Sequence, residues 1–120
     1  HELVYLCTTM ERLEELGLDI VVSDRNAAKA IALFSSERLE WSEDGFIDWP
    51  LMTAQMWNND PQHPDRMERR MAECLVHDFL PWEAVLAVGV QNEAASDRVA
   101  AALDGISHQP PVRVRPDWYY

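Results

Sequence analysis

Short apolar runs of strand length, separated by capping and turn residues, are the feature that most limits how this chain can fold. Four of them are rich in β-branched or aromatic residues: Leu3 to Thr8, Leu18 to Val22, Val85 to Val90 and Val112 to Arg115. The last run alternates valine with arginine, which is typical of a strand with one buried face. Since helical patterns fill much of the sequence between the runs, we predict an α+β fold, with a twisted mixed sheet of four or five strands and flanking helices.

Capping residues and glycines mark two helices in the first third of the chain. Apolar residues recur every three positions from Met10 to Leu16, between Thr9 and Gly17, which predicts a helix that ends at the glycine. Ser23-Asp24 then precedes an alanine-rich stretch and can cap it. We therefore predict a second helix from about Asn26 to Phe34.

The middle of the chain is more irregular. Ser35 to Asp48 reads as a surface connection held by aromatic residues, and a short helix is expected from Trp49 to Trp57. Asn58 to Asp65 contains two prolines and reads as a turn-rich break. Arg66 to Arg70 is helix-prone, whereas periodicity leaves Met71 to His77 open between more helix and a new strand. A last helix is expected from Glu93 to Leu103, capped by Asn92.

Length and charge exclude several classes of protein. With 120 residues and 13.8 kDa, the chain has the size of one domain, residues 1–120. Its 10 Lys+Arg and 21 Asp+Glu give a formal net charge of -11, so any contact with nucleic acid must be local. We find neither a run of about 18 apolar residues nor a signal peptide, and we expect a cytoplasmic protein without membrane contact. Because the chain opens on His1 directly before a strand-like run, we also expect a missing upstream segment.

Cysteine and glycine spacing argue against a disulfide framework, a metal centre and a phosphate loop. Cys7 and Cys74 each lie in an apolar run that suits a small buried side chain. Cys74 and His77 are three residues apart, but no second ligand pair follows at zinc spacing. The four glycines stand far apart, which rules out a glycine-rich nucleotide loop. We expect no metal site.

One carboxylate differs in its surroundings from the other acidic residues. Glu73 stands between Ala72 and Cys74, at the entry to an apolar run, so we expect it to be half-buried. Burying a charge costs several kcal/mol unless a partner or a function retains it, which makes Glu73 a candidate catalytic residue. The alternative is a structural ion pair with Arg69 or Arg70.

This residue lies in a segment that resembles a known family. RRMAECLVHDFLPW, from Arg69 to Trp82, resembles the segment RRxAEFLVHxxxPW of DarT, the DNA ADP-ribosyltransferase toxin of DarT/DarG toxin-antitoxin systems. Three further stretches agree in order with the family's FVFTDGNA, DWxxixxxxW and VxVRPxWYY, namely Ile20 to Ala27, Trp49 to Trp57 and Val112 to Tyr120. This sequence departs from the family at Arg25, where glycine is frequent, and at Cys74, where phenylalanine is frequent.

The resemblance implies that this chain is the C-terminal part of an ADP-ribosyltransferase-like domain. DarT proteins carry an N-terminal portion with a His and a Tyr that help to hold NAD and an Arg that acts beside the catalytic Glu, and those motifs are not found in this sequence. The cofactor-binding residues are therefore expected mainly in a missing N-terminal segment. The resemblance further implies that Ala72 to Val76 is a central strand, with the catalytic Glu73 near its beginning.

The function implied by the resemblance is NAD-dependent transfer of ADP-ribose to a base in single-stranded DNA, with thymine as the expected base. The implied partners are single-stranded DNA, a DarG-like macrodomain antitoxin, and a second chain or segment that completes the fold. A non-catalytic fragment or interaction module that keeps the fold and binds an antitoxin or nucleic acid is the alternative.

Five side chains are expected from the resemblance to lie near a DNA groove: Arg25, Asn26, Trp57, Arg69 and Arg70. Arginine and stacked aromatic residues are the usual contacts of single strands. Each has a structural alternative, with Asn26 as a helix cap, Trp57 as core and the arginines as ion-pair partners of Glu68 and Asp65.

Overall fold

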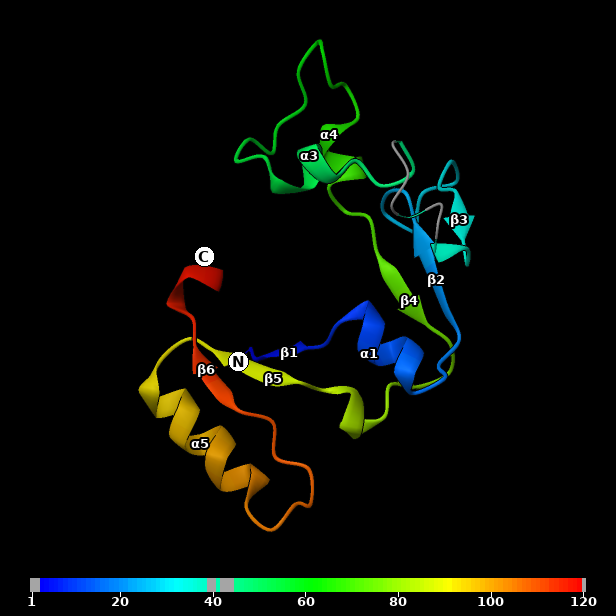
Figure 1. Cartoon of the computed structure of the whole chain (residues 1–120). Helices are drawn as coiled ribbons and strands as arrows, with labels where there is room; N and C mark the ends of the chain where they lie inside the picture. Colours follow the sequence, from blue (N-terminus) through cyan, green and yellow to red (C-terminus); the bar gives the residue numbers. More distant parts are fainter. Residues whose placement is uncertain (1–2, 39–40, 42–44, 120) are drawn as a thin grey trace. The chain divides into compact units, whose positions relative to one another are not determined.

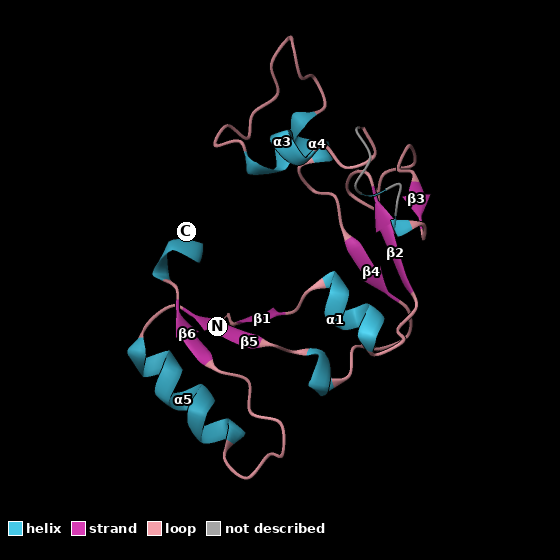
Figure 2. Cartoon of the chain, in the orientation of Figure 1, coloured by secondary structure: helices cyan, strands magenta, loops and turns pink. Residues whose placement is uncertain are grey.

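The computed structural model describes residues 3–38, 41 and 45–119, which fall into two compact units (Figures 1 and 2). The first unit joins the two ends of the chain, His1–Leu18 and Phe79–Tyr120, and the second unit is Asp19–Asp78. Each unit contains a three-stranded sheet. The predicted α+β class is confirmed, but the single sheet of four or five strands is wrong, because the described strands form two separate sheets.

The sheet of the first unit is mixed. Its central strand β5 (Ala87–Val90) pairs antiparallel with β1 (Tyr5–Cys7) and parallel with β6 (Val112–Val114). Parallel neighbours need a crossover, and α5 (Glu93–Leu103) provides it between β5 and β6. The runs predicted as strands at both ends of the chain are thus confirmed.

The core of the first unit is made by β5 and the residues just before it. Val85, Val88 and Val90 are almost fully buried. Side chains from α5, from β6 and from a single 3-10 turn at Trp82–Ala84 pack against them: Trp82, Ala95, Val99, Val112 and Val114. A second 3-10 turn, Pro116–Trp118, follows β6.

The helices of the first unit begin where their capping residues predict. α1 (Met10–Glu15) follows Thr9, whose side-chain oxygen accepts from the Arg12 N–H at 3.2 Å, and Gly17 adopts a φ of 67° just after the helix. α5 follows Asn92, whose side-chain oxygen accepts from the Ala95 N–H at 2.9 Å. Both predicted helices are confirmed.

The sheet of the second unit is antiparallel, in the order β3-β2-β4. β2 (Ile20–Ser23) is the central strand, between β3 (Phe34–Ser35) and β4 (Cys74–Val76). The segment that periodicity left open is therefore a strand after Glu73. The expectation of a central strand is wrong within the described sheet, because β4 pairs there with β2 alone and lies at the edge.

Two short helices precede β4. α3 (Trp49–Thr53) begins after Asp48, which accepts from the Leu51 N–H at 3.0 Å, and ends four residues before the predicted Trp57. α4 is Arg66–Arg69, and the segment between the helices is turns and bends, as the prolines predict. Of the predicted connection from Ser35 to Asp48, residues 39–40 and 42–44 lie outside the described residues.

The helix predicted from Asn26 to Phe34 is wrong. These residues form turns that lead into β3, because the loop is closed by hydrogen bonds between its two ends. The Asp24 N–H donates to the Leu33 carbonyl at 3.1 Å, and the Leu33 N–H donates to the Asp24 carboxylate at 2.9 Å. Tertiary pairing thus overrides the alanine-rich composition. Across the described residues, none of the helices is both long and apolar enough to cross a bilayer.

Candidate active site around Glu73

Glu73 lies directly before β4, where that strand meets the end of β2. Cys74 pairs with Val22, and one residue further the Ser23 N–H donates to the Glu73 carbonyl at 2.9 Å. The helix-prone arginines stop at Arg70, the C-cap of α4, and the chain then turns through Met71 into the strand. The pairing of β4 with β2 therefore determines where the Glu73 side chain begins.

The carboxylate of Glu73 is exposed and held by one backbone donor. The Ala27 N–H donates to its Oε2 at 2.8 Å. The expected half-burial is wrong, since the residue is exposed. Within the part of the chain that is described, no partner is found for Oε1, so this oxygen is available to a substrate. A carboxylate that is already oriented by a hydrogen bond is suited to stabilise a developing positive charge.

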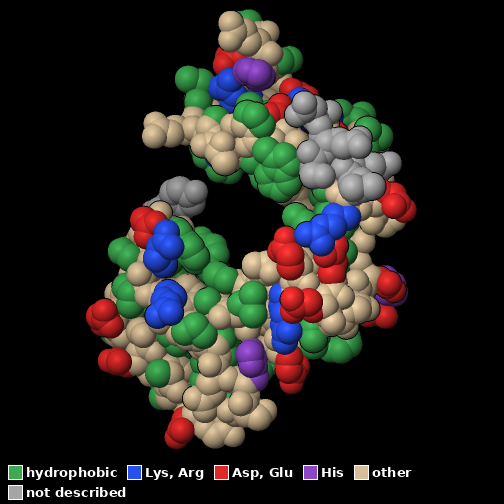
Figure 3. Space-filling model, in the orientation of Figure 1, with side chains coloured by type: hydrophobic (Ala, Val, Ile, Leu, Met, Phe, Trp, Pro, Cys, Tyr) green, Lys and Arg blue, Asp and Glu red, His purple; other side chains and the backbone are tan. Residues whose placement is uncertain are grey.

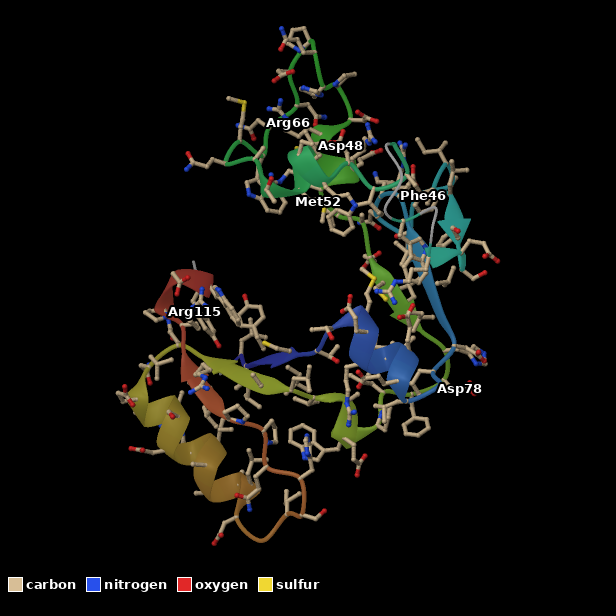
Figure 4. The ribbon with its side chains drawn as sticks, viewed as in Figure 1. Phe46, Asp48, Met52, Arg66, Asp78 and Arg115 are labelled. Carbon is tan, nitrogen blue, oxygen red and sulfur yellow. The ribbon has the colours of Figure 1, made fainter. Side chains whose placement is uncertain are left out.

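The ion pair considered for Glu73 is not formed among the described residues. Arg69 instead pairs with Asp48 at 3.3 Å. Asp48, labelled in Figure 4, lies at the start of α3. Arg70 donates to the carbonyls of Leu51 and Ala54, at the end of α3. Both arginines thus hold α3 against α4, and neither is an ion-pair partner of the Glu73 carboxylate.

Ser23 is the buried group closest to Glu73 in the hydrogen-bond network. It is 0% exposed, and its hydroxyl accepts from the Glu73 N–H at 3.1 Å and donates to the Arg25 carbonyl at 2.6 Å. The sequence does not predict this role of Ser23, because Ser23-Asp24 before an alanine-rich stretch favours a helix cap. The signal was a pair of short polar residues at the end of an apolar strand, which favours local side-chain to backbone hydrogen bonds.

Arg25 and Asn26 lie on the loop that donates to Glu73. Arg25 makes a two-pronged contact with Asp24, at 3.0 and 2.9 Å, and a longer ion pair with Asp65 at 3.6 Å. The hydrogen bond and charge of Asp24 raise the pKa of the Arg25 guanidinium above its ordinary value. Arg25 therefore forms structural ion pairs, which was the alternative to a DNA contact, and Asp65 is one of the two partners predicted for the arginines.

Asn26 does not cap a helix, but it shapes the loop. Its side-chain oxygen accepts from the Ala28 N–H at 2.9 Å, its own N–H donates to the Glu68 carbonyl at 3.1 Å, and its side-chain amide contacts the Met71 sulfur at 3.6 Å. Asn26 is next to Ala27, so the fold brings Arg25, Asn26 and Glu73 together.

Trp57 and Arg70 form a separate pair after α3. The Arg70 guanidinium lies 4.2 Å from the centre of the Trp57 ring, and the tryptophan is 48% exposed. Trp57 is therefore not a core residue. An exposed indole covered on one side by a fixed guanidinium is a surface on which a nucleobase can stack.

Cys74 and His77 lie on β4 and just after it. Cys74 is exposed, which corrects the expectation of a buried thiol, and Cys7 is partly buried. Desolvation by neighbouring groups nevertheless raises the pKa of the Cys74 thiol above its ordinary value, so the thiol is not activated as a nucleophile. No cluster of three potential metal ligands occurs among the described side chains.

Comparison with known proteins identifies the family to which the chain is similar. The family model described as "DarT: ssDNA thymidine ADP-ribosyltransferase, DarT" matches residues 1–120. A DNA ADP-ribosyl transferase of Thermus aquaticus is 33% identical over an alignment of 120 residues, which covers 98% of this chain and 50% of that protein. The chain spans about half the length of the curated relatives it matches.

Solved structures show the same fold. DarT of Thermus sp. 2.9 in complex with NAD+ superposes with a TM-score of 0.85 at 25% identity, over 98% of this chain and 57% of that one. The same protein in complex with ADP-ribosylated single-stranded DNA gives a TM-score of 0.86 at 25% identity, over 98% and 54% of the two chains. With a family model that covers every residue and a matching fold, this chain belongs to the DarT family.

Proposed function

We propose that this chain is the Glu73-bearing part of an ADP-ribosyltransferase that takes ADP-ribose from NAD and attaches it to a base, thymine, in single-stranded DNA. The main observation in support is the Glu73 carboxylate, which is exposed and accepts from the Ala27 N–H at the start of a strand. It lies in a chain that the DarT family model matches throughout. The complexes of Thermus sp. 2.9 DarT with NAD+ and with ADP-ribosylated single-stranded DNA support both substrates.

Glu73 has a defined task in this chemistry. Breaking the bond between nicotinamide and ribose develops positive charge on the sugar, as in glycoside hydrolysis. A carboxylate that is already oriented stabilises that charge without reorganising. Its Oε2 is held by Ala27, and its other oxygen, which has no partner among the described residues, can bind a ribose hydroxyl or accept the proton of the attacking base.

Partners and setting follow from the same family membership. We propose that a DarG-like macrodomain is the antitoxin of this protein, and that a further segment or second chain supplies the remaining NAD contacts, since the relatives are about twice as long. We also propose a cytoplasmic setting, in keeping with two free cysteines.

Substitution of Glu73 tests the proposal. The protein, including any coding residues that precede His1, is incubated with NAD and with oligonucleotides that differ in one base. The mass of each oligonucleotide is then measured by mass spectrometry. Glu73→Gln should reduce transfer by at least about 100-fold, because general-base and charge stabilisation are both lost. Glu83→Gln, at an exposed glutamate of the first unit, is the control and should transfer normally.

The outcomes separate the two functions considered. Undiminished labelling by Glu73→Gln would overturn the assignment of this residue. A folded protein that labels no oligonucleotide, yet binds an antitoxin or single-stranded DNA, would identify an interaction module instead. Labelling of an oligonucleotide without thymine would overturn the proposed target base.

We further propose that Trp57 and Arg70 bind the DNA strand, with Arg25, Asn26 and Arg69 nearby. The support is strongest for Trp57, which is 48% exposed, and weakest for Arg25, which is held by two carboxylates.

Trp57→Ala should weaken binding of a labelled single strand by about 1–3 kcal/mol, whereas Trp57→Phe keeps the stacking surface. Fluorescence anisotropy measures the change, with Met56→Ala as the control at a neighbouring exposed side chain. Equal affinity of Trp57→Ala and the parent protein would remove Trp57 from the DNA site.

A further inference from the structure

The Ser23 hydroxyl joins two segments that determine where the Glu73 carboxylate lies. Ser23 ends β2 and is 0% exposed. Its oxygen accepts from the Glu73 N–H at 3.1 Å, and its proton goes to the Arg25 carbonyl at 2.6 Å. One buried hydroxyl therefore holds both the backbone that bears the carboxylate and the loop opposite it.

The loop side of this network reaches the carboxylate itself. Ala27 follows Arg25 by two residues, and its N–H donates to Glu73 Oε2 at 2.8 Å. The contacts thus form a closed ring, from the Ser23 oxygen to the Glu73 backbone, along that side chain to Ala27, and back through the Arg25 carbonyl. Opening the ring at Ser23 allows the Ala27 donor and the Glu73 backbone to move apart.

Other contacts also hold these two segments. The Ser23 N–H donates to the Glu73 carbonyl at 2.9 Å, which keeps the two strand ends paired but makes no bond to the loop. Asp24 and Leu33 join the two ends of the loop, and the Asn26 N–H donates to the Glu68 carbonyl. Without the hydroxyl, the Glu73 N–H and the Arg25 carbonyl would both lose a partner in these part-buried contacts. Polar groups that are shielded from water and lack a partner are costly, so the local backbone would shift to satisfy them.

Resting on the proposed function, we propose that Ser23 is the positioning residue of Glu73. Ser23 is fully buried and does not touch substrate, so it is not a catalytic residue. It acts by holding the carboxylate and its Ala27 donor in one geometry. A shift of about 1 Å in a reacting group can cost about 100-fold in rate.

Kinetics of the active transferase, together with amide exchange at Ala27, test this role. Ser23→Ala should lower kcat for transfer by about 10- to 100-fold, with the KM for NAD changed by less than about threefold, since only transition-state geometry is affected. Ser23→Thr keeps a hydroxyl on a strand that suits β-branched residues and should restore most of kcat. Exchange of the Ala27 amide should accelerate in Ser23→Ala and return toward the parent rate in Ser23→Thr.

Ser35→Ala is the matched control. Ser35 is a buried serine of the neighbouring strand β3, 7% exposed, and its hydroxyl oxygen accepts from the Glu37 N–H at 3.0 Å. Ser35→Ala removes the same hydroxyl group as Ser23→Ala does, but at a serine whose hydroxyl does not bond Glu73. All variants are assayed well below their melting temperatures, so that each one is folded and a general loss of stability does not lower the measured kcat.

The results distinguish this inference from the proposed function. If Glu73→Gln abolishes transfer while Ser23→Ala matches Ser35→Ala in kcat and Ala27 exchange, the positioning role is wrong and the proposed function stands. If Glu73→Gln transfers normally, the proposed function itself fails. A Ser23→Ala defect that appears only in KM, or that Ser23→Thr leaves unrepaired, also overturns the positioning role.

Discussion

Asp24 shows how a single acidic residue can organise a loop without taking part in chemistry. It is 5% exposed, accepts from the Leu33 N–H and binds Arg25 through its other oxygen. Burial alone would raise the pKa of this carboxyl, but the hydrogen bonds from Arg25 and Leu33 and the Arg25 charge together lower it below 3.8. Because the folded pKa is depressed, the stability that Asp24 contributes is complete above pH 3.8 and is lost as the pH falls through the lowered value.

Asp24→Asn should therefore destabilise the protein in a pH-dependent way. We expect a loss of about 1–3 kcal/mol in the free energy of unfolding at pH 7, because a charged hydrogen bond is replaced by a neutral one. The difference from the parent protein should shrink below pH 3.8, where the parent carboxyl becomes protonated. Urea titrations at several pH values measure it, with Asp97→Asn, at an exposed site on α5, as the control. A difference that stays constant with pH would contradict this account.

Glycine is required at position 89 because the Trp118 side chain packs directly against it. A Cβ at this position of β5 would lie 2.5 and 2.8 Å from two carbon atoms of the Trp118 ring. Gly89→Ala should therefore cost about 1–3 kcal/mol in unfolding free energy, as overpacking does. In a Trp118→Ala background the same change should cost much less, since the clash is gone. Equal costs in the two backgrounds, measured by urea unfolding, would show that Trp118 is not the reason.

At the scale of elements, α5 depends on a cap from the residue directly before it. Asn92 accepts from the Ala95 N–H at 2.9 Å, and Glu93 adds a carboxylate to the first turn. Asn92→Ala should lower the free energy of unfolding by about 1 kcal/mol, whereas Asn92→Asp keeps the acceptor and should be nearly neutral. Thermal melts followed by circular dichroism measure both, with Gln91→Ala as the control at the exposed residue before it. If Asn92→Ala melts like Gln91→Ala, the cap is not stabilising.

Predicted elements succeeded where their hydrogen bonds are local. The helices after Thr9, Asp48 and Asn92 begin as predicted, because each cap bonds a backbone N–H three residues away. The helix predicted from Asn26 to Phe34 failed, since the ends of that segment pair with each other and Ala27 is engaged by Glu73, 46 residues further along. Local propensity cannot anticipate such a partner.

At the scale of the whole molecule, the chain has much exposed apolar surface. Leu6, Ile31 and Phe34 are 53%, 64% and 51% exposed, and the chain spans about half the length of its curated relatives. On the face shown in Figure 3, acidic and basic side chains are interspersed, without one broad basic patch. The apolar side chains are the better candidates for surface that another segment covers.

We therefore expect the 120-residue chain by itself to associate and to bind a hydrophobic dye. Light scattering after gel filtration should give a mass above 13.8 kDa that rises with concentration. Ile31→Glu should reduce dye binding, because Ile31 is 64% exposed. A monomer at all concentrations, without dye binding, would argue that the chain needs no covering segment.

By itself, the sequence determined the strands β1, β2, β5 and β6, the capped helices and the α+β class, and it singled out Glu73 as the candidate catalytic residue, because these depend on neighbouring residues or on a motif that can be read in order. Only the tertiary structure decided that β4 is an edge strand, that Glu73 is exposed, and that Ser23 and Ala27 hold it. The Ser23 hydroxyl and the Glu73 N–H are 50 residues apart in the chain, and the Ala27 N–H and the Glu73 carboxylate are 46 apart. Those contacts form only when β2 and β4 pair, so no local pattern could show them.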